Sequence, residues 1–223
     1  MVKYILIYDA GSYCQKGVCF LIKSTFYNLP DAKRERVIRA IMAEFAGNDS
    51  DKVSINRIIE RADISRGSFY QYFDDKVDLA EVVLKSLVDL SLEELFRAVS
   101  VSNGDIFYVY TKAFDVIAGF RQDEEQCALM TNLVRNMRVS DSLISTYIST
   151  RCRGFEELKK LNTSFSREKL RMESDEDMLT LQQLLNAVLQ GAVYRVYGKE
   201  EDAEAVRAGF IKKIDIIRRG AEK

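Results

Sequence analysis

Hydrogen-bonding side chains crowd one short segment of the 223-residue chain, residues 66–73, with the sequence RGSFYQYF. On a helix, Arg66, Ser68 and Gln71 would share one exposed face, and only the two phenylalanines clearly point inward. Such side chains are the donors and acceptors that proteins use to read base edges in a DNA groove. A helix with so much polar chemistry and so little core is therefore predicted to touch a partner, and its residue types suit a nucleic acid.

Two short helices are needed to position these side chains. An apolar stripe at helical spacing is formed by Ile55, Ile58, Ile59 and Ala62. Ser54 precedes this stripe and Ser65 precedes the polar segment, so each serine can cap the first free amides of a helix. Only residues 62–64 separate the two helices. This arrangement predicts a helix-turn-helix, whose second helix enters the major groove of DNA.

The wider motif is more specific than a generic helix-turn-helix match. It reads Ala62-x-Ile64-Ser65-Arg66-Gly67-Ser68-Phe69-Tyr70-x-Tyr72-Phe73-x-x-Lys76-x-x-Leu79. It resembles the DNA-binding signature of the tetracycline-repressor (TetR) family, and an apolar helix at residues 33–45 resembles that family's first helix. The family usually has glycine where this chain has Asp63, but Asp tolerates a left-handed backbone, so we expect the turn to survive. An ordinary helical hairpin is the alternative, and it would not require Tyr, Phe and Lys at these offsets.

The resemblance also implies which residues contact DNA. The predicted set is Lys33, Ser54, Arg66, Gly67, Ser68, Tyr70, Gln71, Tyr72 and Lys76. The face with Arg66, Ser68 and Gln71 should touch base edges or adjacent backbone, and Gly67 should let the helix approach DNA closely. The two tyrosines and Lys76 resemble the family's phosphate contacts.

Bulk charge gives little support to DNA binding. Residues 22–76 carry 10 basic and 9 acidic residues, and residues 77–223 carry 21 and 24. The attraction to phosphate must therefore come from placement, with Lys33, Arg34, Arg66 and Lys76 facing DNA while the acids face away. We expect specific binding without strong non-specific affinity.

Composition predicts an all-α fold. One proline and 47% hydrophobic residues favour long helices. The expected helices of the second domain span residues 75–99, 105–120, 123–138, 141–161, 175–197 and 200–219, with Asp74, Asp105, Asp123 and Asp141 as caps and a loop at 162–174. We predict a three-helix DNA-binding domain at 24–76 and a helical effector-binding and dimerisation domain at 77–223.

Residues 1–23 form an atypical N-terminal extension without helical periodicity. Their apolar run is too short for a signal peptide and lacks a cleavage site. The codons for Lys16-Gly17-Val18 can contain a ribosome-binding site, in which case translation would start at Leu21. We interpret the segment as upstream translation; the alternative is a genuine extension that packs on the DNA-binding domain.

Enzymatic function is not expected. The chain has no histidine, and it has neither a Gly-rich phosphate loop nor a recognisable nucleophile elbow. Its four cysteines lack CxxC spacing, which indicates a reduced cytoplasmic setting without a disulfide or zinc site. No apolar run is long enough to span a membrane. We predict no cofactor and no metal.

The last two helices are expected to form a homodimer. Residues 175–197 carry two apolar stripes, one through Leu181 and Leu185 and one through Leu184 and Gly191. Two stripes indicate burial on two sides, and the resemblance implies a four-helix interface with a two-fold mate. The predicted dimer residues are Leu181, Leu185, Val188, Ala192, Phe210 and Ile214. A monomer that buries both stripes internally is the alternative.

Large aromatic and Met side chains on the middle helices can line an apolar effector cavity. The predicted contacts are Phe107, Tyr110, Phe114, Met137 and Tyr147. The sequence therefore predicts a transcriptional regulator, most simply a repressor that a small apolar effector releases from a palindromic operator. One alternative is a TetR-like protein that lacks an effector and responds to a protein partner. A helical-bundle enzyme is a third class, which the absence of histidine disfavours.

Overall fold

A computed structural model describes residues 22–48, 52–136 and 156–223. Within these ranges the chain is helical and has no strand, apart from a single antiparallel bridge between Leu170 and Glu222. The all-α fold class is therefore confirmed. The extension at 1–23 lies almost wholly outside the described residues, as does most of the helix expected at 141–161.

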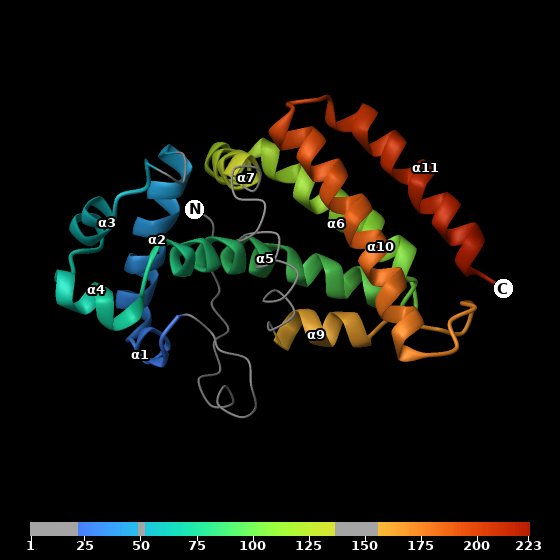
Figure 1. The fold of residues 1–223 in the computed structure, drawn as a ribbon, viewed down its shortest axis with the longest axis horizontal. Helices are drawn as coiled ribbons and strands as arrows, with labels where there is room; N and C mark the ends of the chain where they lie inside the picture. Colours follow the sequence, from blue (N-terminus) through green and yellow to red (C-terminus); the bar gives the residue numbers. More distant parts are fainter. Residues whose placement is uncertain (1–21, 49–51, 137–155) are drawn as a thin grey trace.

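Four helices form a compact head at one end of the molecule (Figure 1). They are α1 (Ser24–Tyr27), α2 (Asp31–Gly47), α3 (Ile55–Ala62) and α4 (Arg66–Tyr72). The apolar stripe predicted for residues 33–45 is buried, with Val37 and Ile41 fully inaccessible. The sequence did not predict α1, which is too short to show a period; its Phe26 is nevertheless buried against Tyr72 and Phe73.

The remaining helices build the larger part of the molecule. They are α5 (Lys76–Val101), α6 (Ile106–Gly119), α7 (Glu124–Asn136), α9 (Glu156–Thr163), α10 (Asp175–Val193) and α11 (Ala203–Ala221), with a 3-10 turn at Phe120–Gln122 and a π-helical turn at Tyr194–Gly198. In Figure 1, α5 runs from the head beneath α6 and α10, and α11 lies on the outer side of α10. Ion pairs join α11 to α6, from Arg207 to Asp115 and from Arg218 to Asp105.

Several predicted helix starts are confirmed, among them Asp175 for α10, and two are corrected. Asp105 caps α6, and Asp123 accepts a bond from the Gln126 amide at the start of α7. At α5 the cap is Asp75, not Asp74, since the Asp75 carboxylate accepts from the Asp78 amide. Ser174 caps α10 in a reciprocal capping box, and Asp202 caps α11, which therefore begins at residue 203 instead of 200.

The head is tied to the larger part through α2. The side-chain amide of Asn132, on α7, donates hydrogen bonds of 2.8 and 3.1 Å to the backbone carbonyls of Phe45 and Ala46. These carbonyls lie in the last turn of α2, where the helix has no amide donors of its own to offer them. A side chain from α7 therefore caps a helix of the head.

Candidate nucleic-acid interface

The turn between α3 and α4 has the predicted geometry. Asp63 adopts the left-handed conformation, with φ 50° and ψ 56°, and its amide closes the end of α3. The amide of Arg57 donates to Ser54 Oγ, and the amide of Ser68 donates to Ser65 Oγ. Both predicted caps are thus present, and together they fix the direction in which α4 leaves the turn.

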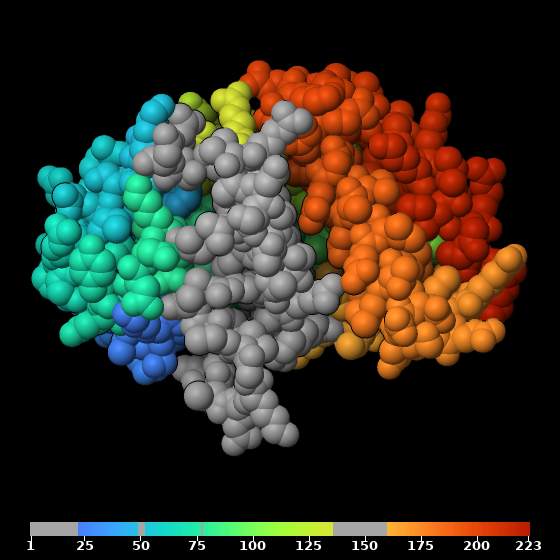
Figure 2. Space-filling model, in the orientation of Figure 1, coloured from blue at the N-terminus to red at the C-terminus, as the bar shows by residue number. Residues whose placement is uncertain are grey.

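The second helix, α4, is held by one face and exposes the other. Phe69 is buried, and Phe73 follows it into the core as the C-cap. Arg66 and Gln71 are exposed, Tyr70 is 41% exposed and Ser68 is partly exposed. In Figure 2 the helix-turn-helix residues lie at the left-hand end of the molecule, away from α10 and α11. The helix-turn-helix therefore lies at the end of the molecule opposite α10 and α11.

Arg66 is oriented by two neighbours. Its guanidinium carbon lies 5.8 Å from the centre of the Tyr70 ring, and its Nη1 donates to Asn56 Oδ1 at 3.4 Å. It makes no ion pair with any residue in the described ranges. A charged guanidinium held only by a ring face and a long hydrogen bond keeps most of its donors available for a partner.

Sequence reasoning missed Asn56 as a member of this surface. Asn56 is exposed on α3 beside Arg66. The sequence could have predicted this position, because Asn56 lies outside the apolar stripe of α3. An asparagine amide can also hydrogen-bond to base edges as glutamine does.

The fold leaves room for a side chain at Gly67. A Cβ built there would meet only Ser65 Oγ, at 3.9 Å, which is an ordinary contact. Because glycine weakens a helix relative to alanine, its presence on an exposed helix face calls for an explanation outside the chain. Close approach to DNA is the explanation that the sequence predicted.

One side chain differs from its expected exposure. Tyr72 was predicted to lie on the polar, exposed side of α4, but it is only 5% exposed. Its ring packs on Phe26, and Lys33 Nζ lies 5.9 Å from the ring centre. The ring packs against a residue of α1, a helix that was not predicted, so its burial could not be predicted either. A phosphate contact by Tyr72 or Lys33 stays a prediction.

The remaining predicted DNA contacts lie on two helix starts. Ser54 is partly buried at the start of α3, and Lys76 is exposed at the start of α5. Both lie where free amide groups favour an anion.

A buried carboxylate joins α2 to α3. Glu44 is fully inaccessible and accepts from the Ser54 amide at 3.0 Å and from Arg57 Nε at 2.8 Å, with Arg61 Nη1 3.5 Å away. Burial by itself raises the pKa of this carboxyl, but the bonds from Arg57 and Ser54 and the charges of both arginines outweigh burial and lower its pKa. Glu44 is thus held as a carboxylate at the start of the helix-turn-helix.

The predicted dimer residues are buried or partly buried within the single chain, and a dimer contact through them stays a prediction. Leu181, Leu185, Ala192, Phe210 and Ile214 are all at most 5% exposed in the single chain, and Val188 is partly buried. Side chains already buried by their own chain have almost no surface left to bury against a mate. The second stripe is the exposed one, with Leu184 53% exposed and Ala187 and Gly191 exposed beside it.

The predicted effector residues pack against other side chains where the structure describes them. Phe114 stacks on Phe210 at 5.0 Å, and Arg218 lies over the ring of Phe107. The Tyr110 hydroxyl donates to Asn186 Oδ1 at 2.8 Å, and burial raises the pKa of Tyr110. Met137 and Tyr147 lie outside the described residues. Effector contact stays a prediction for all five.

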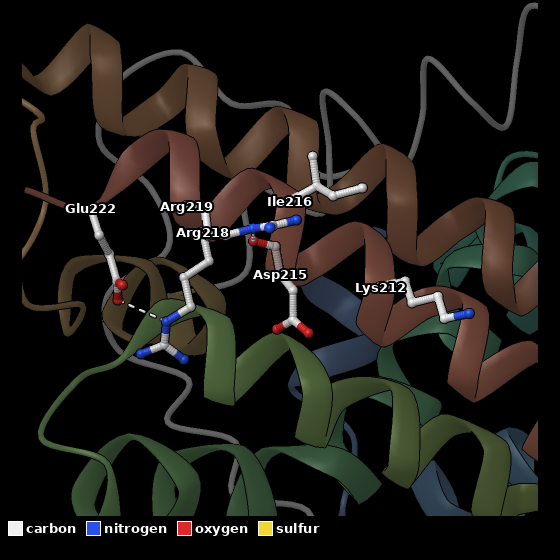
Figure 3. Close-up of a pocket in the computed structure, with 6 residues that line it drawn as sticks. All are labelled: Lys212, Asp215, Ile216, Arg218, Arg219 and Glu222. Carbon is white, nitrogen blue, oxygen red and sulfur yellow. Dashed lines mark hydrogen bonds and ion pairs between the residues drawn. The ribbon is translucent and has the colours of Figure 1, made fainter.

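A surface pocket of about 570 Å³ opens on α11. Figure 3 shows its lining residues, Lys212, Asp215, Ile216, Arg218, Arg219 and Glu222, with a hydrogen bond from Arg218 to Glu222. Five of these six side chains are charged, so this pocket is not the aromatic cavity that the sequence predicted. Among the described helices, none is long and apolar enough to cross a membrane.

A helix-turn-helix head with a polar, exposed second helix, joined to a larger helical domain, defines a DNA-binding regulator of transcription. Residues 37–83 match the family described as bacterial regulatory proteins, tetR family. Residues 105–221 match the tetracyclin repressor-like C-terminal domain. The chain therefore belongs to the TetR family, which is a family of transcription factors and not of enzymes.

Individual proteins are similar to the whole chain or to a part of it. An uncharacterized HTH-type transcriptional regulator, YxbF of Bacillus subtilis, is 31% identical over 72 residues; the match spans 32% of this chain and about a fifth, 19%, of that protein. A TetR-family regulator from Streptomyces coelicolor superposes with a TM-score of 0.54 at 18% identity, over 89% of this chain and 94% of its own, and so shares the fold. A TetR-family regulator from Chloroflexus aurantiacus is 28% identical over 91% of this chain and 99% of its own, with a TM-score of 0.42.

Proposed function

We propose that the protein is a homodimeric repressor that binds a palindromic operator through α4. The observation that carries this proposal is the exposed face of α4, where Arg66 and Gln71 are available and the fold leaves room for a side chain at Gly67. Arg66, Ser68, Gln71 and the neighbouring Asn56 would meet base edges or adjacent backbone. Lys33, Ser54, Tyr70, Tyr72 and Lys76 would contact the phosphates.

The experiment is a footprint on the DNA that flanks the gene for this protein, followed by binding titrations on the protected sequence and on random DNA. The repressor proposal predicts a protected site with two-fold symmetry. Arg66→Ala should weaken the free energy of binding by roughly 1–3 kcal/mol on the protected sequence and by less on random DNA. An equal loss of binding free energy on both DNAs would mean that Arg66 contacts phosphate only. A protected site without two-fold symmetry would contradict binding by a homodimer with one DNA-binding domain on each half-site.

A homodimer is supported by exposed apolar and small residues on α10 and α11, which we call the α10–α11 face and define by Leu184, Ala187, Gly191 and Ile216. Leu184 is 53% exposed and Ile216 is 61% exposed. A Cβ at Gly191 would meet nothing within 4 Å, so glycine there is not required by the fold. Large apolar side chains beside small ones suit the close packing of a second helix pair.

Release from DNA is proposed to follow from a small apolar effector. Effector binding would shift α5 and α7 relative to the head, and the Asn132 bonds to α2 supply a physical contact for that shift. Two recognition helices must reach grooves about 34–36 Å apart, so a small shift suffices to weaken binding.

A protein partner in place of a small effector is the second candidate. It is favoured by the packing of Phe107, Tyr110 and Phe114 against other side chains. A thermal screen of apolar compounds separates the two candidates. An inducer must both raise the melting temperature and release operator DNA, since linkage is reciprocal.

A further inference from the structure

The C-terminal end of the recognition helix α4 is held by residues that precede α2. The backbone amide of Lys23 donates to the carbonyl of Tyr72 at 3.1 Å, and Lys23 Nζ donates to the carbonyl of Tyr70 at 2.8 Å. The Thr25 hydroxyl donates to the carbonyl of Gln71. Two residues therefore supply three donors to three consecutive carbonyls.

These carbonyls are the ones that a helix cannot satisfy by itself. The last four carbonyls of a helix have no amide partner in the next turn. In α4 the first of them, on Phe69, accepts from the Phe73 amide. Lys23 and Thr25 satisfy the other three, so the whole C-terminal turn is capped.

The capping segment is itself anchored to the head. Lys23 Nζ lies 2.5 Å from Asp74 Oδ1, just beyond α4. Phe26 is 1% exposed, and its ring centre lies 5.0 Å from that of Phe73. The donors are therefore carried by a piece of chain that is fixed to the same core as α4.

A helix of seven residues needs such support. Isolated helices shorter than about 12 residues are marginal in water, and α4 also contains a glycine. The order of α4 must come from its contacts, which are the Ser65 cap at the start, Phe69 in the core and the two residues at its end.

We propose that Lys23 and Thr25 are positioning residues of the DNA interface. They cap the last turn of α4 and thereby hold Tyr70 and Gln71 in the orientation that meets DNA. The proposal rests on α4 being the recognition helix, as proposed above, but the capping itself is a property of the free protein.

The main variant is Thr25→Val, which removes the hydroxyl and changes neither shape nor charge. Amide hydrogen exchange of the full-length free protein should become about three- to tenfold faster at residues 70–73, which is the usual range for one lost hydrogen bond. Ser24→Ala is the matched control, since its hydroxyl makes no hydrogen bond with any residue in the described ranges, and exchange at residues 70–73 should stay unchanged in that variant. Thr25→Ser restores the hydroxyl and should restore slow exchange.

Binding to a duplex that carries the footprinted sequence tests the second half of the proposal. Thr25→Val should weaken binding several-fold without changing the salt dependence of the affinity, because no phosphate contact is lost. Lys23→Met removes the bond from Lys23 Nζ to the Tyr70 carbonyl and the ion pair with Asp74, and it should also accelerate exchange at residues 70–73. This second variant keeps the test decisive if local rearrangement compensates for Thr25→Val.

The outcomes test two statements separately: that Lys23 and Thr25 cap α4, and that this capping positions α4 for DNA. Unchanged exchange in both variants overturns the capping, and faster exchange with unchanged operator affinity overturns the positioning role. An equal effect of Ser24→Ala would assign the effect to α1 as a whole and overturn the assignment to Thr25. If no duplex is protected at all, the proposed function fails, while the exchange measurement still tests the capping.

Discussion

Asn132 of α7 donates a hydrogen bond of 2.8 Å to the backbone carbonyl of Phe45, 87 positions earlier in the chain and in the last turn of α2. One residue before Phe45 lies Glu44, whose buried carboxylate binds Arg57 of α3. The end of α2 is therefore in contact with α7 on one side and with the helix-turn-helix on the other. This short chain of bonds is one route between the two parts of the molecule.

Replacing Asn132 with Leu tests this contact. The variant keeps a similar volume and removes the two donors, so the last carbonyls of α2 lose their caps. We expect the free energy of unfolding to fall by about 1–2 kcal/mol, measured by urea denaturation, with faster amide exchange at the end of α2. Thr131→Val, one residue away on the same helix, is the control. Unchanged amide exchange at the end of α2 in Asn132→Leu would mean that the bonds from Asn132 do not stabilise α2.

Glu44 makes the stability of the head depend on pH. Its pKa is lowered from the value of 4.5 that it has in an unfolded chain, since bonds and charges from Arg57, Ser54 and Arg61 outweigh the effect of burial. The stabilisation is therefore complete above about pH 5 and disappears as the pH falls through the lowered, folded-state pKa.

Glu44→Gln should abolish this contribution. The variant keeps the shape but loses the charge-assisted bonds, so the free energy of unfolding at pH 7 should fall by about 1.5–3 kcal/mol. The difference from the wild-type protein should shrink as the pH drops below 4. Glu60→Gln, on an exposed position of α3, should match the wild-type protein at every pH. A constant difference across the acid range would contradict the role of ionised Glu44.

The helix-turn-helix was predictable from sequence because local chemistry determines it. The serines at 54 and 65 can only cap the helices that follow them, and the left-handed Asp63 needs no distant partner. The same logic predicted the Asp105 cap of α6.

The choice of face on α10 was not predictable in this way. Both of its stripes are apolar, and the sequence alone does not say that Leu185 meets the core while Leu184 meets solvent. That depends on where α6 and α11 lie, which is a property of the whole fold. The capping of α4 by Lys23 and Thr25 was missed for a related reason, since it joins residues 46 and 47 positions apart.

The α10–α11 face gives a prediction about dimerisation. Leu184→Glu places a carboxylate in the proposed seam, where it would be desolvated and unpaired. We expect light scattering to show a monomer and operator affinity to collapse, because each half-site would hold a single head. Leu179→Glu is the matched control, since Leu179 is also exposed on α10 but lies about 140° around the helix from Leu184. An unchanged dimer mass in Leu184→Glu would place the seam elsewhere.

Gly67→Ala separates the needs of the fold from the needs of DNA binding. The added methyl group has room, because its nearest neighbour would be Ser65 Oγ at 3.9 Å. Alanine favours a helix over glycine by up to about 1 kcal/mol, so the melting temperature should stay the same or rise. If the helix backbone approaches DNA at this point, the methyl group collides with it, and operator affinity should fall at least tenfold. Gly47→Ala, at the exposed end of α2 where a Cβ would meet nothing within 4 Å, is the control for DNA binding. A Gly67→Ala variant that binds the footprinted duplex as tightly as the wild-type protein would show that α4 does not approach DNA through this residue.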